Sequence, residues 1–222
     1  MWGDPYRLQN ILAQLSDERP GPEKMNFYYI GGSITEGWGG IKKGMLDTKQ
    51  TYIGWVEAWF EEQYPGRTVH HRRGKGATTS FWASSCIDSV IEQDADVVFV
   101  EYTINDLHSI RGEVEATLDN PKRRGTERLL RRLLTYEKRP AVVVLHTWAP
   151  KVLDTWTQRK PHNDFYTTYE DYWDIILKYY GIPSLSMRNA LHTLVRSSEP
   201  GFGLNELWGD DLHPTSHCHT ST

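Results

Sequence analysis

Two uninterrupted apolar runs constrain the fold of this chain more than any other feature. Residues 97–100 (Val-Val-Phe-Val) and 141–145 (Ala-Val-Val-Val-Leu) contain no polar side chain. Strands of this kind are buried on both faces, which is typical of a parallel sheet lying between two layers of helices. Weaker β-rich runs occur at 27–30, 68–71 and 182–187. The sequence therefore predicts a parallel sheet of about five strands.

Amphipathic stretches separate these runs. Apolar residues recur at helical spacing over 52–63, 79–93, 126–138 and 165–180, and a leading helix is expected over 6–15. Strands that alternate with helices of this length predict βαβ units. Right-handed crossovers then favour a flavodoxin-like, doubly wound sheet in a three-layer α/β/α sandwich. In such sheets the functional groups gather at the carboxyl ends of the strands.

Length and composition narrow the class of protein. A chain of 222 residues suits a single domain over 1–222, with a lead-in helical segment over 1–25 and a polar tail over 215–222. The net charge of −4 argues against nucleic acid as the main partner. We interpret the basic run over 122–132 as a solvated helix face. Two cysteines exclude a disulfide scaffold. We see no signal peptide and no membrane-spanning segment, so a soluble, cytoplasmic protein is the default expectation. The oligomeric state stays open.

Polar residues that suit acyl transfer follow three of the predicted strands. Ser33 stands in a glycine turn after the first strand, where its hydroxyl can be presented without a neighbouring Cβ. Gly76 follows the second strand and can direct a backbone N–H at a substrate oxygen. Asn105 follows the third strand, and an amide is a good neutral donor to an oxyanion. Each of these motifs alone is more often an ordinary turn.

The segment Asp210-Asp211-Leu212-His213-Pro214 is the most specific motif. Because Asp210 lies three residues before His213, its carboxylate can turn back and accept a hydrogen bond from the imidazole Nδ1. Nε2 is then free to act as a base toward a serine. The sequence therefore predicts a triad of Ser33, His213 and Asp210.

The order of these motifs resembles the SGNH (GDSL-type) hydrolase superfamily. Its four signature residues correspond here to Ser33, Gly76, Asn105 and His213, and the motifs span positions 31–214. The resemblance implies Asp210 as the triad acid and an oxyanion hole made by Ser33, Gly76 and Asn105. Three departures stand out: Gly-Gly-Ser replaces the usual Gly-Asp-Ser, Thr103 replaces a glycine, and the helix that commonly follows His-Pro is expected to be missing.

The resemblance implies a serine esterase that needs no metal or organic cofactor. The expected partner is a small-molecule ester, either a simple acyl ester or an acetylated carbohydrate. Two alternatives stay open: an O-acyltransferase that uses the same site, and a catalytically weak carbohydrate-binding relative suggested by 9 Trp and 12 Tyr. Trp38, Trp148 and Trp156 are candidates to frame the pocket.

Other chemistries fit less well. The glycine pattern of an α/β-hydrolase and the Gly-Lys-Ser/Thr of a phosphate-binding loop are both absent. The best rival is a metal site, because His213, His217, Cys218 and His219 are ligand types close together in sequence. A second ligand pair with clear spacing is missing, so we expect no metal.

Overall fold

The computed structural model describes residues 5–17, 24–39, 44–108, 121–150 and 168–220. A five-stranded sheet forms the centre, with the order β4-β1-β5-β6-β7 and every neighbouring pair parallel. Counted in chain order the five strands read 2-1-3-4-5, which is the flavodoxin-like doubly wound arrangement. Strands β2 and β3 form a separate antiparallel pair. The predicted α/β fold and the number of strands in the sheet are confirmed. The strands are β1 Met25–Gly31, β2 Trp38–Gly39, β3 Gly44–Met45, β4 Thr68–Gly74, β5 Val97–Glu101, β6 Ala141–His146 and β7 Ser184–Ser186.

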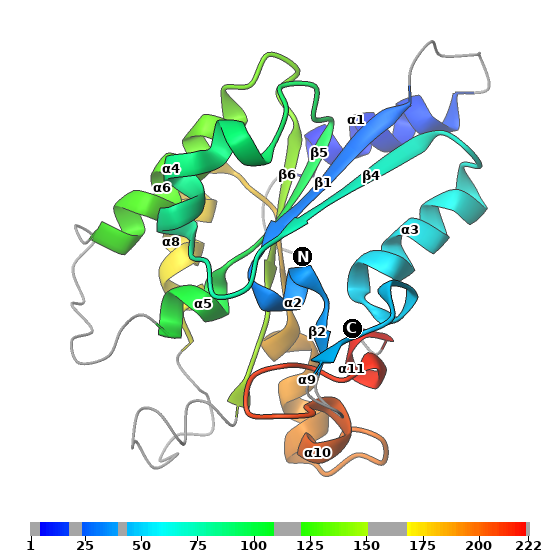
Figure 1. The fold of residues 1–222 in the computed structure, drawn as a ribbon, viewed down its shortest axis with the longest axis vertical. Helices are drawn as coiled ribbons and strands as arrows, with labels where there is room; N and C mark the ends of the chain where they lie inside the picture. The colour runs from blue at the N-terminus through cyan, green and yellow to red at the C-terminus, as the bar shows by residue number, and fades with distance from the viewer. Residues whose placement is uncertain (1–4, 18–23, 40–43, 109–120, 151–167, 221–222) are drawn as a thin grey trace.

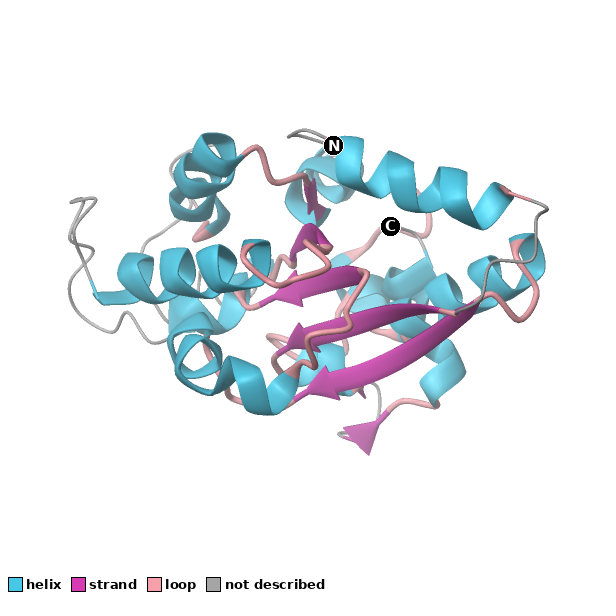
Figure 2. Ribbon diagram, turned by 90° about the horizontal axis from the view of Figure 1, so that it is seen from above, coloured by secondary structure: helices cyan, strands magenta, loops and turns pink. Residues whose placement is uncertain are grey.

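Helices cover both faces of the sheet, as Figures 1 and 2 show. Helices α1, α3 and α4 agree with the predicted ranges to within a few residues, and α6 begins five residues earlier than predicted. Helix α8 begins at Glu170 within the range predicted over 165–180, of which residues 165–167 lie outside the described residues. Helix α9 begins at Met187, the last residue of the strand predicted over 182–187. The helices are α1 Tyr6–Ser16, α2 Ser33–Glu36, α3 Tyr52–Gln63, α4 Ser80–Val90, α5 Thr103–His108, α6 Pro121–Leu134, α8 Glu170–Tyr180, α9 Met187–Arg196, α10 Leu204–Leu207 and α11 Ser216–Thr220, with a 3-10 turn at Thr48–Gln50.

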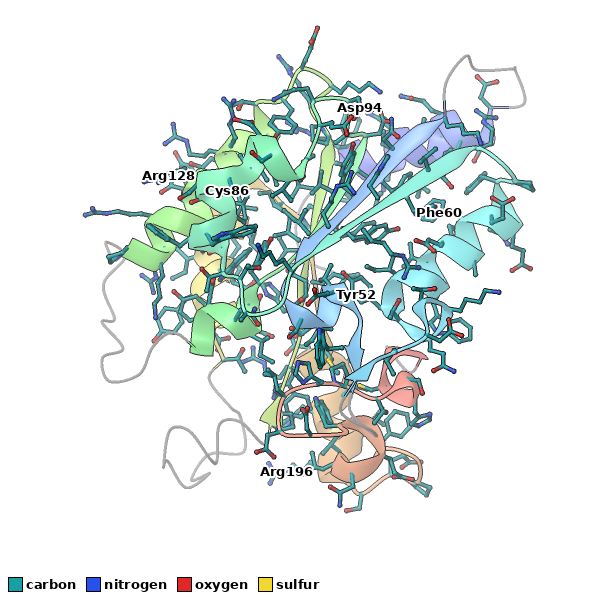
Figure 3. All side chains as sticks on the ribbon, viewed as in Figure 1. Tyr52, Phe60, Cys86, Asp94, Arg128 and Arg196 are labelled. Atoms are coloured by element: carbon teal, nitrogen blue, oxygen red, sulfur yellow. The ribbon has the colours of Figure 1, made fainter. Side chains whose placement is uncertain are left out.

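Alternation along β1 divides the core into two layers. Tyr28 and Ile30 pack with α4, α6 and α8, whereas Phe27 and Tyr29 pack with α1 and α3. All four of these side chains are fully buried. Successive residues of a strand point to opposite faces, so one central strand supplies both layers of the sandwich. Figure 3 shows Phe60 between α3 and the sheet, where its ring lies 4.7 Å from that of Phe27.

Short polar caps fix where the helices begin beside the site. Thr51 accepts a hydrogen bond from the N–H of Gly54 and starts α3. Thr79 accepts from the N–H of Trp82 and starts α4, as the sequence predicts. A side-chain cap of this kind satisfies one of the unpaired N–H groups at a helix start. These helices therefore begin at defined positions near the carboxyl edge of the sheet.

The C-terminal segment lies across that edge. In Figure 1 it passes beside α2 and β2. Where a polar tail is expected, residues 216–220 form the short helix α11. The side chain of Cys218 gives the reason, because it is fully buried among Trp148, Leu191 and Trp208. Among the described helices, none has the length and apolar character needed to cross a membrane.

Candidate active site

Ser33 lies at the switch point of the sheet, where the chain leaves β1 between β4 and β5. Strand β1 ends at Gly31, the N–H of Gly32 donates to the carbonyl of Glu101, and Ser33 is the first residue of α2. The serine is buried, with 9% of its surface exposed. Ligands of doubly wound sheets bind at this crevice. The first strand therefore delivers the hydroxyl to the expected place.

The structure brings His213 and Asp210 to Ser33. His213 Nε2 lies 2.9 Å from Ser33 Oγ, and His213 Nδ1 lies 2.9 Å from Asp210 Oδ2. The other carboxylate oxygen of Asp210 accepts the backbone N–H groups of Leu212 and His213, at 2.8 and 2.6 Å. One carboxylate thus shapes the turn and also orients the imidazole. This arrangement has the distances that proton transfer from a serine requires.

The charge of Asp210 is held by the same contacts. Partial burial acts to raise its pKa, but the hydrogen bonds from the His213 backbone and imidazole and from the Leu212 N–H outweigh that effect. The pKa of the carboxyl is therefore lowered below its usual value. A carboxylate that stays ionised can accept the Nδ1–H bond and stabilise an imidazolium when one forms.

Asn105 approaches Ser33 because the residue before the serine is a glycine. A Cβ on Gly32 would lie 2.3 Å from Asn105 Nδ2, closer than any side chain tolerates. One amide N–H of Asn105 donates to the carbonyl of Thr78 at 2.6 Å, which fixes the orientation of the amide. The amide nitrogen carries a second N–H. Gly32, which stands where the family motif Gly-Asp-Ser has its Asp, is thus the position at which Asn105 packs against the backbone.

Gly76 reaches the site but already has a partner. Its N–H donates to Glu36 Oε2 at 2.8 Å. In the same loop after β4, Ala77 has a φ of 58°, in the left-handed region that residues with a Cβ rarely adopt. The N–H of Gly76, which is the expected oxyanion donor, therefore lies next to Ser33 but is already hydrogen-bonded to the Glu36 carboxylate. This contact is not predictable from sequence motifs, because Glu36 and Gly76 are 40 residues apart.

A buried carboxyl group lies under the serine turn. Glu101 is fully buried at the end of β5, and its oxygens accept hydrogen bonds from Thr147 at 2.8 Å and Thr35 at 3.0 Å. The hydroxyl of Tyr52 lies 3.0 Å from that of Thr35, and Figure 3 shows Tyr52 at the end of α3 nearest α2. Burial raises the pKa of Glu101 to about 7, against the opposing effect of the two threonine bonds. The turn that carries Ser33 is thus tied to the sheet through one carboxyl.

A second buried carboxyl supports Asn105 from the next residue along the chain. Asp106 accepts hydrogen bonds from the backbone and hydroxyl of Ser80 and from the indole of Trp173. Burial raises its pKa to about 6, although these bonds oppose the shift. Single motifs in the sequence do not predict that these two carboxyls support the site. A charged residue at the end of an apolar strand, such as Glu101, is nevertheless a usable signal.

The remaining candidates from the sequence are three tryptophans and a possible metal site. Trp38 is 39% exposed, and its ring lies 6.3 Å from that of His213. Trp148 is buried against Trp208 and does not frame an opening. Trp156 lies outside the described residues. Within the described part of the chain, His, Cys, Asp and Glu side chains form no group of three that could hold a metal ion.

Similar folds occur among esterases of known structure. A two-domain esterase active on acetylated mannans matches with a TM-score of 0.74 and 22% identity over 98% of this chain. This chain spans 50% of that protein's length. An acetylxylan esterase from Geobacillus stearothermophilus matches with a TM-score of 0.61 and 16% identity, over 90% of this chain and 91% of that one. A GDSL-like lipase from Parabacteroides merdae matches with a TM-score of 0.65, 12% identity and coverages of 90% and 94%.

Comparison of the sequence with curated proteins gives no significant match. The model of the GDSL-like lipase/acylhydrolase family, in contrast, matches residues 29–220. That range contains the last three residues of β1, the strands of the central sheet from β4 onward, and the motifs at their carboxyl ends. The chain therefore belongs to the GDSL-like lipase/acylhydrolase family.

Proposed function

We propose that this protein is a serine-dependent carboxylic-ester hydrolase. The observation that carries the proposal is the continuous chain of contacts from Asp210 through His213 to Ser33, with 2.9 Å at both links. A serine hydroxyl is a weak nucleophile on its own and needs a base within hydrogen-bond reach. The base in turn needs a partner that fixes its tautomer. We propose Ser33, His213 and Asp210 for these three roles.

The reaction follows from this geometry. Ser33 Oγ attacks the carbonyl carbon of the ester while His213 Nε2 accepts the hydroxyl proton. The carbonyl oxygen becomes an oxyanion, and the donors that we propose for it are the N–H groups of Ser33 and Gly76 and the Asn105 amide, with the Gly76 N–H first released by Glu36. The bond to the alcohol oxygen then breaks, and His213 returns the proton to that oxygen. Water, deprotonated by His213, attacks the acyl carbon of the acyl-enzyme. The bond from that carbon to Ser33 Oγ then breaks, His213 returns the proton to Oγ, and the acid leaves. These steps use no metal ion and no organic cofactor.

The substrates that we propose are small acyl esters, with acetylated carbohydrates foremost. Two of the similar structures are esterases of acetylated polysaccharides. In this chain Trp38 presents an exposed ring beside His213. Aromatic faces pack well against the apolar faces of other rings, including those of sugars. A sugar ester could therefore rest on Trp38 while its acyl group reaches Ser33.

The experiment that tests the hydrolase is labelling with a fluorophosphonate probe, which reacts with activated serines. We expect the wild type to be labelled, Ser33→Ala to lose all labelling, and His213→Ala to react slowly. Ser85→Ala is the matched control, because Ser85 is an exposed serine on α4 and should leave labelling unchanged. Equal labelling of wild type and Ser33→Ala, or no labelling of a folded wild type, would refute the proposal.

A further inference from the structure

The carboxylate of Glu36 stands at the mouth of the site and touches two groups that the reaction would need. Its Oε2 accepts the N–H of Gly76 at 2.8 Å and the indole N–H of Trp38 at 3.1 Å. Gly76 is also close to the nucleophile, because a Cβ built on it would lie 3.9 Å from the Cβ of Ser33. The carboxylate is therefore bound on the donor that an oxyanion would use.

The resting contact cannot persist during acyl transfer. A single N–H directed at the carboxylate is not available to the developing oxyanion, and two negative charges beside one donor repel each other. Glu36 must leave Gly76 before the transition state forms. Its side chain is exposed and is on the last residue of α2, so a rotation about its side-chain bonds can move the carboxylate without disturbing Ser33.

Where the carboxylate goes depends on what the substrate offers. A carboxylate that loses an N–H partner regains the lost interaction if a hydroxyl group is presented to it. Trp38 is bonded to the same oxygen and its ring lies 6.3 Å from that of His213. Because His213 is the residue proposed to protonate the leaving alcohol, that alcohol would lie near Trp38. A leaving group that is a sugar brings an apolar ring face for Trp38 and free hydroxyls for Glu36. A simple aryl or alkyl alcohol brings no hydroxyl of this kind.

We propose that Glu36 is a specificity-determining residue. In the resting protein its carboxylate accepts the Gly76 N–H. A carbohydrate leaving group with a free hydroxyl beside the ester gives the carboxylate a new donor, and Glu36 then releases the Gly76 N–H. This inference rests on the proposed function, since it assigns Glu36 a task in hydrolysis at Ser33. Glu36 and Trp38 together select polyhydroxylated esters. Simple esters are disfavoured because they must displace the carboxylate without replacing its hydrogen bond.

The test compares kcat/KM for two acetate esters in wild type, Glu36→Ala and Glu36→Gln. One substrate is 4-nitrophenyl acetate, and the other is a partly acetylated xylo-oligosaccharide with free hydroxyls. We expect Glu36→Ala to raise kcat/KM severalfold for 4-nitrophenyl acetate and to lower it at least tenfold for the oligosaccharide. Glu36→Gln keeps the size of the side chain without its charge, and we expect it to change both values in the same directions by smaller factors. Glu62→Ala removes an exposed glutamate on α3 and should alter neither value.

The outcomes separate the two proposals. If Ser33-dependent hydrolysis occurs but both substrates change by the same factor in the Glu36 variants, or neither changes, the role of Glu36 is refuted and the hydrolase stands. If no acetate ester is hydrolysed in a Ser33-dependent way, both are refuted. A fully acetylated form of the oligosaccharide adds a further check, because it lacks free hydroxyls. The wild type should prefer the partly acetylated form, and Glu36→Ala should lose that preference.

Discussion

Replacing the buried Glu101 by glutamine should change how the stability of the protein depends on pH. Burial raises the pKa of this carboxyl from 4.5 to about 7. The folded protein therefore holds the proton more tightly than the unfolded chain does. Stability from this group is complete below about pH 4.5 and is lost as the pH rises through about 7. At about 1.4 kcal/mol per pKa unit, the loss amounts to about 3 kcal/mol.

The assay is urea denaturation at a series of pH values from 4.5 to 8, followed by tryptophan fluorescence. Between pH 4.5 and 8 the free energy of unfolding of the wild type should fall by about 3 kcal/mol more than that of Glu101→Gln, because the amide cannot ionise. An amide also retains one oxygen to accept a hydrogen bond from Thr35 or Thr147, so the variant should fold. Glu62→Gln, which changes an exposed glutamate on α3, should follow the wild-type curve. Parallel curves for wild type and Glu101→Gln would refute the reasoning.

Three further predictions concern the loops and the core. Asn105→Ala should lower kcat by about 100-fold with little change in KM, because a donor to the oxyanion is lost while the ester-binding surface remains; an unchanged kcat in steady-state assays would count against the oxyanion role. Ala77→Gly should raise the free energy of unfolding by up to about 1 kcal/mol, since a glycine relieves the strain of φ 58°; a lower melting temperature would contradict this. Leu133→Ala should lower the free energy of unfolding by about 3 kcal/mol, because Leu133 is fully buried between α6 and the sheet; a loss below about 1 kcal/mol in urea titration would mean that the site collapses around the cavity.

The fold was predictable because its main signals are local. The apolar runs at β5 and β6 permit little besides strands buried on both faces, and the helices between them have their own periodicity. The Asp210–His213 pair was equally accessible, since both ends of that contact lie within four residues. The positions of Ser33, Gly76 and Asn105 followed from the order of strands, because parallel strands end at one edge of the sheet.

Interactions between distant polar groups were beyond sequence reasoning. The hydrogen bond from Gly76 to Glu36 depends on how the loop after β4 meets the end of α2. In the sequence both residues look like ordinary turn residues. Arg123 gives a second example. It belongs to a basic run that reads as a solvated helix face, yet its side chain is 5% exposed and its guanidinium lies 4.7 Å from the centre of the Tyr172 ring. Arginine is buried when a ring and other partners replace water, and those partners come from a helix far along the chain.

Helices α9 and α6 show why the observed boundaries differ from the predicted ones. The predicted strand over 182–187 forms as β7 but ends at Ser186, because Ser186 accepts the N–H of Asn189 and starts α9 there. In α6, Gly125 discourages a helix in the sequence, but its lack of a side chain lets the helix approach the backbone of α4, where a Cβ would lie 2.8 Å from Phe81 Cα. At Gly125 tertiary packing thus overrides local propensity, whereas at Ser186 a local side-chain cap sets the boundary.

The nucleophile and its base are 180 residues apart, and they are carried by different parts of the core. Ser33 directly follows the central strand β1, whereas the segment with His213 is anchored by a small cluster around Trp148, Trp208 and Cys218. A small anchor of this kind can open without unfolding the sheet, since separate packing units have separate opening free energies. Esterase activity would then report the docking of this segment. On heating or in urea it should vanish while the helix signal of the sandwich is still intact, and in refolding it should be the last property to return.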